Sequence, residues 1–317
     1  MTSLANAQQV SSSPSVVRQS LDDAWWTGPM LAPSAATLPR GHFLIEPYLY
    51  DVTTQGRFDG DGVRRSVSRS HGFGSLAYVL YGLADRLTIG MIPTVGYNDV
   101  SDGLSSSGVG LGDVTVQAQY RLTQFREGRW MPTTSIAVQE TFPTGKYDQL
   151  GDRPSDGLGS GACTTTLAIY SQTYFWLPNG RILRMRVNVS QAFSSRASIE
   201  DVSVYGTEAG FRGHAKPGNS FFVDASWEYS VTRRWVLALD ATYHRSGNTR
   251  VIGHSILHPT SASDQRDSGS SVAFGLAPAI EYSWRNNIGV LLGARVIAAG
   301  RNTATTITPA LAINFVH

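Results

Sequence analysis

Hydrophobic and polar residues alternate with a period of two along most of the chain beyond its first forty residues. In the segment 218–231, Val223 and Trp227 share one face, and Asp224 and Glu228 share the other. Successive side chains of a strand point to opposite faces, so this pattern predicts β-strands with one apolar and one polar face. A strict alternation of this kind is typical of the strands of a transmembrane barrel.

Twelve segments of this type can be placed on the sequence, each close to the length of a tilted membrane strand. They lie near residues 41–54, 71–82, 86–97, 110–122, 131–143, 161–176, 181–194, 218–231, 235–246, 271–284, 287–298 and 304–316. Their number and length are sufficient for a closed barrel that crosses a membrane.

The connections between these segments alternate in length. Long polar connections lie at 55–70, 98–109, 144–160, 195–217 and 247–270, and short ones at 83–85, 123–130, 177–180, 232–234 and 285–286. Outer-membrane barrels place short turns in the periplasm and long loops outside. The sequence therefore predicts an all-β fold, a transmembrane antiparallel up-and-down β-barrel of about 12 strands with short periplasmic turns and long extracellular loops.

Aromatic residues gather at both ends of the predicted strands. Tyr120, Trp130, Tyr174, Trp176, Tyr229, Trp235, Tyr282 and Trp284 lie beside the short turns, and Tyr97, Phe142, Phe193, Phe221, Tyr243 and Phe274 lie at the long-loop ends. Two such bands are typical of the girdles where amphipathic rings meet lipid headgroups. The alternative interpretation is an ordinary aromatic core, but the position of the rings at strand ends favours the girdles.

The composition excludes several other classes of protein. Hydrophobic residues make up 41% of the 317 residues and charged residues only 16%, whereas soluble proteins usually carry about 25% charged residues. No stretch approaches the roughly 20 apolar residues of a spanning helix, which leaves a large soluble all-β core or a barrel. The net charge is +2 and the basic residues are scattered, which argues against nucleic acid as a partner. Cys163 is the single cysteine, so we expect no internal disulfide, no metal site and no cofactor.

The first forty residues differ from the rest of the chain. Residues 1–40 are rich in Ser, Ala and Pro and lack strand alternation. We interpret them as an N-terminal tail, or a small periplasmic plug, that precedes a barrel of residues 41–317. Trp25 and Trp26 are the candidate plug residues. Residues 3–8 resemble the end of a signal peptide, with small residues at the positions of a cleavage site; the alternative is an ordinary Ala- and Ser-rich tail.

Three short motifs resemble a known family of outer-membrane proteins. They are Gly110-Leu111-Gly112-Asp113-Val114, Tyr120-Arg121-Leu122 and Thr141-Phe142-Pro143-Thr144-Gly145. In this order and spacing they resemble the outer-membrane family associated with the meta-pathway of phenol degradation, over roughly residues 70–317. The resemblance implies a channel or transporter, in the outer membrane of a Gram-negative-type bacterium, for passive uptake of small hydrophobic or aromatic solutes.

The last predicted strand carries a further resemblance. Leu311, Ile313 and Phe315 share one face, which resembles the C-terminal signature of outer-membrane barrels, although two residues follow the Phe here. This resemblance implies outer-membrane lipid and the barrel-assembly machinery as partners.

Charged residues on the polar strand faces are candidates to line the lumen. They are Glu46, Asp113, Arg121, Arg184, Arg186, Asp224, Glu228, Asp240, His244, Glu281 and Arg295. In a narrow barrel they would pair across the interior, and in a wider one they would line a water path. We predict that Arg184 and Arg186 pair with Asp224 and Glu228, because the two predicted strands are neighbours.

Two other functions compete with a channel. A closed structural or adhesion barrel would have its lumen filled by side chains and by the N-terminal residues. A phospholipase-like barrel enzyme would need a nucleophilic serine beside a base, and His244 and Ser246 share a strand face. That face points to the lumen and away from lipid substrate, so we predict no catalytic residues and no enzyme activity.

Overall fold

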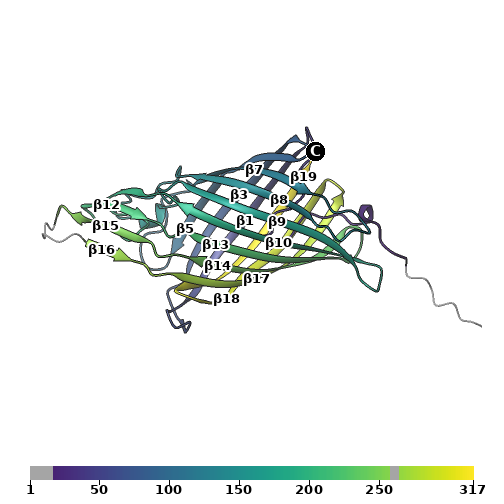
Figure 1. Ribbon diagram of the computed structural model, residues 1–317. Coiled ribbons are helices and arrows are strands. Elements are labelled where there is room, and N and C mark those ends of the chain that lie inside the picture. The colour runs from purple at the N-terminus through teal and green to yellow at the C-terminus, as the bar shows by residue number, and fades with distance from the viewer. Residues whose placement is uncertain (1–16, 258–263) are drawn as a thin grey trace, which may run out of the picture.

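The computed structural model describes residues 17–257 and 264–317, and the signal-peptide-like residues 3–8 lie outside these ranges. Twelve antiparallel strands form one closed barrel (Figure 1). The wall consists of β1 (Phe43–Phe58), β3 (Ser70–Ala84), β4 (Leu87–Ile92) continued by β5 (Thr94–Val100), β7 (Val114–Thr123), β8 (Thr133–Phe142), β9 (Thr164–Trp176), β10 (Ile182–Ser194), β13 (Ser220–Ser230), β14 (Trp235–Ser246), β17 (Ser271–Arg285), β18 (Ile288–Arg301) and β19 (Thr303–Val316). The predicted fold class is thereby confirmed.

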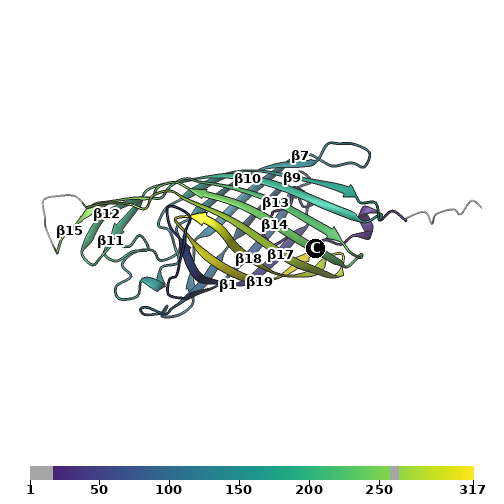
Figure 2. The same ribbon diagram turned by 90° about the horizontal axis from the view of Figure 1, so that it is seen from below.

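Each strand pairs with its sequence neighbours along the wall, and β1 pairs with both β3 and β19. This last pairing closes the barrel. Within the described part of the wall, β7 pairs with β4 but not with β5, whose second edge pairs only with the two-residue strand β6 (Gly110–Leu111). The C-terminus lies at the end that carries the short turns, which we assign to the periplasm (Figures 1 and 2). The short strand β2 (Arg64–Arg65) pairs with the far end of β1.

One predicted strand is interrupted in the structure. The segment predicted at 86–97 is divided into β4 and β5 at Pro93, which has no N–H to donate to a neighbouring strand. The next segment, predicted at 110–122, starts its main run only at Val114, and the short strand β6 (Gly110–Leu111) pairs with β5 instead. Alternation alone does not locate such an irregularity.

The two faces of the strands are separated as predicted. Outward side chains such as Leu237, Leu239 and Ile280 are exposed, while inward ones such as Ser226 are buried. Residues that are buried by lipid in a membrane protein are exposed in the isolated chain, so these apolar side chains form the lipid-facing belt.

Aromatic rings lie at both ends of this belt, with one correction. Trp235, Tyr282 and Trp284 are in ring contact at the short-turn end. The prediction that Tyr174 and Trp176 belong to the same girdle was wrong, because both contact the N-terminal segment instead. Inward-facing aromatic residues near a turn have the same sequence pattern as girdle residues.

The regions predicted as long loops at 195–217 and 247–270 contain a second sheet. It consists of β11 (Ala197–Glu200), β12 (Phe211–Lys216), β15 (Arg250–Ser255) and β16 (Asp264–Asp267), in that order. These strands extend β10, β13, β14 and β17 beyond the barrel, at the left in Figure 1. We call it the extracellular sheet. The loops at this end are therefore partly ordered as strands.

Two short 3-10 helices complete the described part of the chain, η1 (Leu21–Asp23) and η2 (Pro154–Asp156). Within the described residues there is no helix with the length and apolar character needed to cross a membrane.

Candidate functional site

Residues 17–42, which we call the N-terminal segment, run inside the barrel before β1 begins. The segment enters at the short-turn end, where the Trp25 backbone N–H donates to the Arg233 carbonyl over 2.9 Å. It returns to the same end, where the Thr37 hydroxyl donates to the Asp85 carbonyl over 2.8 Å. The segment therefore forms a loop inside the periplasmic part of the lumen.

Buried carboxylates of the wall hold the entering side of this loop. Glu281 accepts hydrogen bonds from the backbone N–H groups of Thr27 at 2.8 Å and Gly28 at 2.9 Å. Asp240 accepts one from the N–H of Met30 at 3.1 Å. Gly28 has a φ of 118°, a conformation that residues with a Cβ rarely adopt. A carboxylate that receives two backbone N–H donors is a strong anchor for an extended chain.

Polar side chains of the wall hold the returning side of the loop. Arg186 donates to the Ala32 carbonyl over 2.6 Å, and Asn188 donates to the Pro33 carbonyl over 2.9 Å. Farther along the loop, the Gln119 side-chain amide donates to the Ser34 carbonyl over 2.9 Å. An extended segment has no internal hydrogen bonds, so its buried backbone groups need these partners.

An ion cluster lies beneath the loop. Fully buried Glu228 accepts a hydrogen bond from Arg184 Nε over 2.6 Å and lies 3.1 Å from Arg186 Nε. The Arg184 guanidinium stacks over the ring of Trp26 at 4.3 Å. The predicted pairing of the two arginines thus occurs with Glu228, whereas Asp224 has no hydrogen-bond partner within the described residues.

Small residues of the wall provide the space for the loop. Met30 packs in a buried cluster with the inward alanines Ala238, Ala277, Ala279, Ala310 and Ala312. Ala35 is fully buried against Ala137 and Ala168. Because larger side chains at these positions would overlap the loop, the wall is shaped for this occupant.

The remaining predicted lumen residues lie outside this cluster. Glu46 lines the cavity beside the loop, and Arg295 donates to the Thr242 hydroxyl over 3.4 Å. His244 lies on the same strand as Thr242, farther from the periplasmic end. Arg121, near the periplasmic end of β7, is partly buried. The structure therefore brings together Arg184, Arg186, Glu228, Asp240 and Glu281. Asp224 and Arg295 lie near Asp240, although the described chain shows no ion pair between Arg295 and Asp240, and the other predicted residues take no part in the cluster.

Asp113 has a different environment, at the extracellular end of β7. It accepts hydrogen bonds from the Gly145 N–H at 3.0 Å and from the Ser160 N–H at 2.8 Å. Burial and the nearby Asp113 carboxylate raise the pKa of the Tyr205 phenol to about 12. The phenol therefore stays protonated and donates to the Ser160 carbonyl. Asp113 thus holds the loop between β8 and β9 against the barrel mouth.

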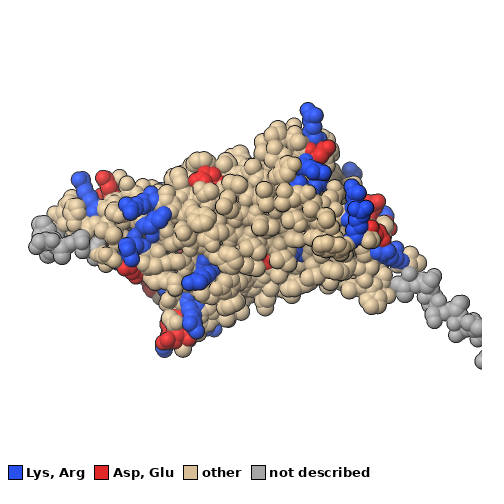
Figure 3. All heavy atoms as spheres, viewed as in Figure 1, with Lys and Arg blue, Asp and Glu red and all other residues tan. Residues whose placement is uncertain are grey.

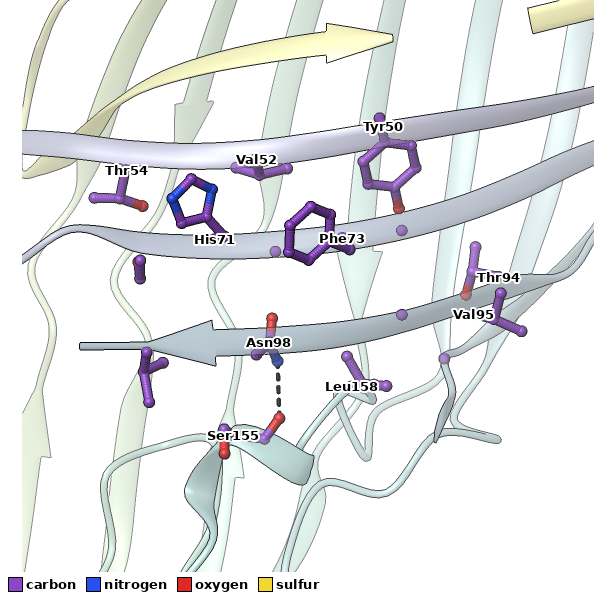
Figure 4. A pocket seen from close by; sticks show the side chains of 16 residues that line it. Tyr50, Val52, Thr54, His71, Phe73, Thr94, Val95, Asn98, Ser155 and Leu158 are labelled. Atoms are coloured by element: carbon purple, nitrogen blue, oxygen red, sulfur yellow. Dashed lines mark hydrogen bonds between the residues drawn. The ribbon is translucent and has the colours of Figure 1, made fainter. Parts of the chain in front are cut away.

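Three cavities follow one another along the β1 and β3 side of the lumen. The first, of about 450 Å³, is lined by Tyr50, Val52 and Leu158 (Figure 4). The second, of about 300 Å³, shares Tyr50 and Val52 and is also lined by Leu31. The third, of about 240 Å³, shares Leu31 and reaches the periplasmic end of β19 at Val316.

Tyrosines mark the path between these cavities. Tyr48 and Tyr78 line both the second and the third cavity, and their ring centroids are 6.1 Å apart. Tyr50 lies over Gly74, where an added Cβ would meet its ring at 2.4 Å. Sequence reasoning restricted to charged residues missed these tyrosines, although Tyr48 and Tyr50 share a strand face with the predicted lumen residue Glu46.

The fold and the site define a class of protein: a twelve-stranded transmembrane β-barrel whose lumen contains its own N-terminal segment. Within this class the particular family is also shown. Residues 61–311 match the family described as "Putative MetA-pathway of phenol degradation", and the chain belongs to that family. The resemblance of the three sequence motifs is thereby confirmed.

Several solved structures of barrels are similar to this chain. An outer membrane channel from Pseudomonas putida F1 is similar with a TM-score of 0.68 and 17% identity, over 91% of this chain and 100% of that one. The NanC porin, with a TM-score of 0.44 and 11% identity, covers 84% of this chain and 98% of its own. A mutant of the TodX monoaromatic hydrocarbon channel, with a TM-score of 0.38 and 11% identity, covers 88% of this chain and 89% of its own. A search among curated proteins gave no match.

Proposed function

We propose that this protein is an outer-membrane channel for the passive passage of small hydrophobic or aromatic molecules. The row of three cavities with shared lining residues is the observation that carries the proposal. Membership of a family named for phenol degradation, and the similarity to a barrel described as an outer membrane channel, support it.

The chemistry of the path supports the solute class. Met30, Leu31 and Leu76 offer apolar surface in the second cavity, and Tyr50 and Tyr78 add rings with polar hydroxyls. Apolar walls with a few polar groups are typical of sites that bind small organic molecules. Aromatic rings of the wall can stack on an aromatic solute, so the path favours a phenol-like molecule over a sugar.

A substitution that narrows the path tests this proposal. Gly74→Val places a side chain where the Tyr50 ring lies, and we expect it to reduce the flux of phenol into protein-containing liposomes several-fold. Ser75→Val, at the adjacent position on the outward face of β3, should leave the flux unchanged. Equal flux through both variants, with both folded by heat-modifiable gel mobility, would disprove the assigned path.

We also propose that the barrel is not an enzyme. His244 Nε2 and Ser246 Oγ are 3.5 Å apart, at the limit of a hydrogen bond, and no carboxylate of the described residues hydrogen-bonds to the histidine. Among residues 17–257 and 264–317, no three His, Cys, Asp or Glu side chains are grouped so as to hold a metal ion. The purified wild-type protein should therefore show no more phospholipase activity than the Ser246→Ala variant. Phospholipase activity that is present in the wild type and absent in Ser246→Ala would instead support an enzyme.

The proposal extends to the partners of the barrel. The apolar belt is expected to lie in outer-membrane lipid, and the final strand β19 is expected to be recognised by the barrel-assembly machinery. Removal of residues 304–317 should prevent assembly, because β19 closes the barrel against β1.

A further inference from the structure

The extracellular sheet has two unlike faces. On one face Ile199, Phe211 and Val251 are buried and pack with Tyr205. The opposite face presents exposed charged residues, among them Arg212 and Lys216 of β12 and Arg250 of β15. Figure 3 shows Lys and Arg atoms gathered over β12 and β15 on the outer side of the molecule, beyond the tan surface of the barrel. The same face carries Glu200, paired in register with Arg212, and Asp267, paired in register with Arg250. The excess positive charge is therefore concentrated at Lys216 and the neighbouring Arg196.

Strand register places the basic residues side by side. Lys216 is paired with Arg250, and two residues farther on His214 is paired with Ile252. With Arg196 at the start of β11 and Asn248 before β15, these residues line a groove of about 350 Å³. We call it the basic groove.

The charges of the basic groove are only partly compensated. Arg250 pairs with Asp267 at 3.2 Å, and hydrogen bonds from Asn248, Gln265 and Arg250 lower the pKa of Asp267 to about 2, so this carboxylate stays charged. Neither Arg196 nor Lys216 has a carboxylate partner among the described side chains. The Lys216 ammonium donates to the Ser194 carbonyl, which leaves its charge uncompensated. The basic groove therefore carries excess positive charge.

The position of the basic groove points to its ligand. Phe221, Tyr243 and Phe274 are in ring contact on the outward face, where they mark the level of the outer headgroups. Arg250, the first residue of β15, lies seven residues beyond Tyr243 of β14, which corresponds to at most about 23 Å at about 3.3 Å per residue before tilt. Phosphorylated sugars of the outer-leaflet glycolipid extend into this zone above the headgroups.

We propose that the basic groove binds phosphate groups of lipopolysaccharide, the phosphorylated glycolipid of the outer leaflet. Arginine forms bidentate hydrogen bonds with phosphate, and lysine attracts it as a point charge. Basic residues next to a membrane surface bind anionic lipid additively. The bound glycolipid would fix the extracellular sheet upright above the membrane.

A binding titration tests this proposal with the full-length protein in detergent micelles. The probes are lipopolysaccharide, the same lipopolysaccharide with its phosphates removed, and inorganic phosphate. The double variant Arg196→Gln/Lys216→Gln should bind lipopolysaccharide at least about tenfold more weakly than the wild type. The control Arg126→Gln/Arg129→Gln removes the same charge from exposed positions in a short-turn connection and should bind like the wild type.

Each other outcome overturns the proposal. Unchanged affinity in the groove variant would place lipopolysaccharide elsewhere, and equal binding of the phosphate-free form would exclude phosphate recognition. Displacement by inorganic phosphate at equal concentration would mean a site for a free anion. Both variants lie on exposed positions, so heat-modifiable mobility should show a folded barrel in each case.

Discussion

Deletion of residues 1–40 is expected to raise the single-channel conductance of the barrel several-fold in a planar bilayer. The described part of these residues occupies the periplasmic half of the lumen and is fixed there by Glu281, Asp240 and Arg186. Its removal would leave an inward wall of small residues such as Ala277 and Ala279 facing water. The wall would then enclose a wider, water-filled path.

Two further variants separate plug removal from damage to the barrel. Glu281→Gln/Asp240→Asn weakens the hydrogen bonds to Thr27, Gly28 and Met30 while keeping the full chain, and brief openings should become more frequent. A disulfide between Ala35→Cys and Ala137→Cys, in a Cys163→Ser background, should hold the loop in place because both alanines belong to one small buried cluster. Reduction of that disulfide should restore the wild-type current. Unchanged conductance on deletion would show that the loop does not limit passage.

The strand pattern was predictable because it depends on a local physical rule. Each wall residue faces either lipid or the interior, so alternation such as that of Asp224 and Val223 recurs in the later strands. In β3 the inward residues Leu76 and Tyr78 are apolar or aromatic too, and the alternation is weaker. The interruptions of the strands were harder to predict from the sequence. Pro93 divides one strand because it lacks a hydrogen-bond donor, and the sequence shows a proline there but not how far the adjoining segment is displaced.

The candidate site was predictable only in part, for a different reason. The alternation along β10 and β13 placed Arg184, Arg186 and Glu228 on the lumen side. The order of the strands along the chain made β10 and β13 neighbours, as the structure shows. Nothing in the alternation shows that the N-terminal segment runs through the lumen beside these residues, because most of its hydrogen bonds to the wall are made by backbone groups. The neutral side chains that hold it, such as Asn188 and Gln119, resemble any inward polar residue. The extracellular sheet was missed because its strands are short and polar on one face.

Glu228→Gln is expected to lower the stability of the folded barrel by about 3–5 kcal/mol, the usual effect of breaking a buried ion pair. The substitution keeps the shape of the side chain but removes the only carboxylate within salt-bridge distance of Arg184 and Arg186 in the described chain. Two guanidinium groups would then remain buried with uncompensated charge. Urea-induced unfolding in lipid vesicles, followed by tryptophan fluorescence, measures the free energy of unfolding.

The charge itself, rather than packing, is responsible for this expected loss, and two controls separate the two causes. Glu127→Gln breaks the exposed Arg18–Glu127 pair, whose side chains are 53% exposed on both sides, and should change stability by less than about 1 kcal/mol. The triple variant Arg184→Met/Arg186→Met/Glu228→Leu removes all three charges and keeps apolar volume, so it should recover most of the lost stability. If the triple variant loses as much free energy of unfolding as Glu228→Gln does, charge compensation is not the main contribution. The hydrogen bonds to the N-terminal segment would then stabilise the barrel more than the ion pairs do. A change below about 1 kcal/mol in Glu228→Gln would show that water reaches the two arginines and screens them.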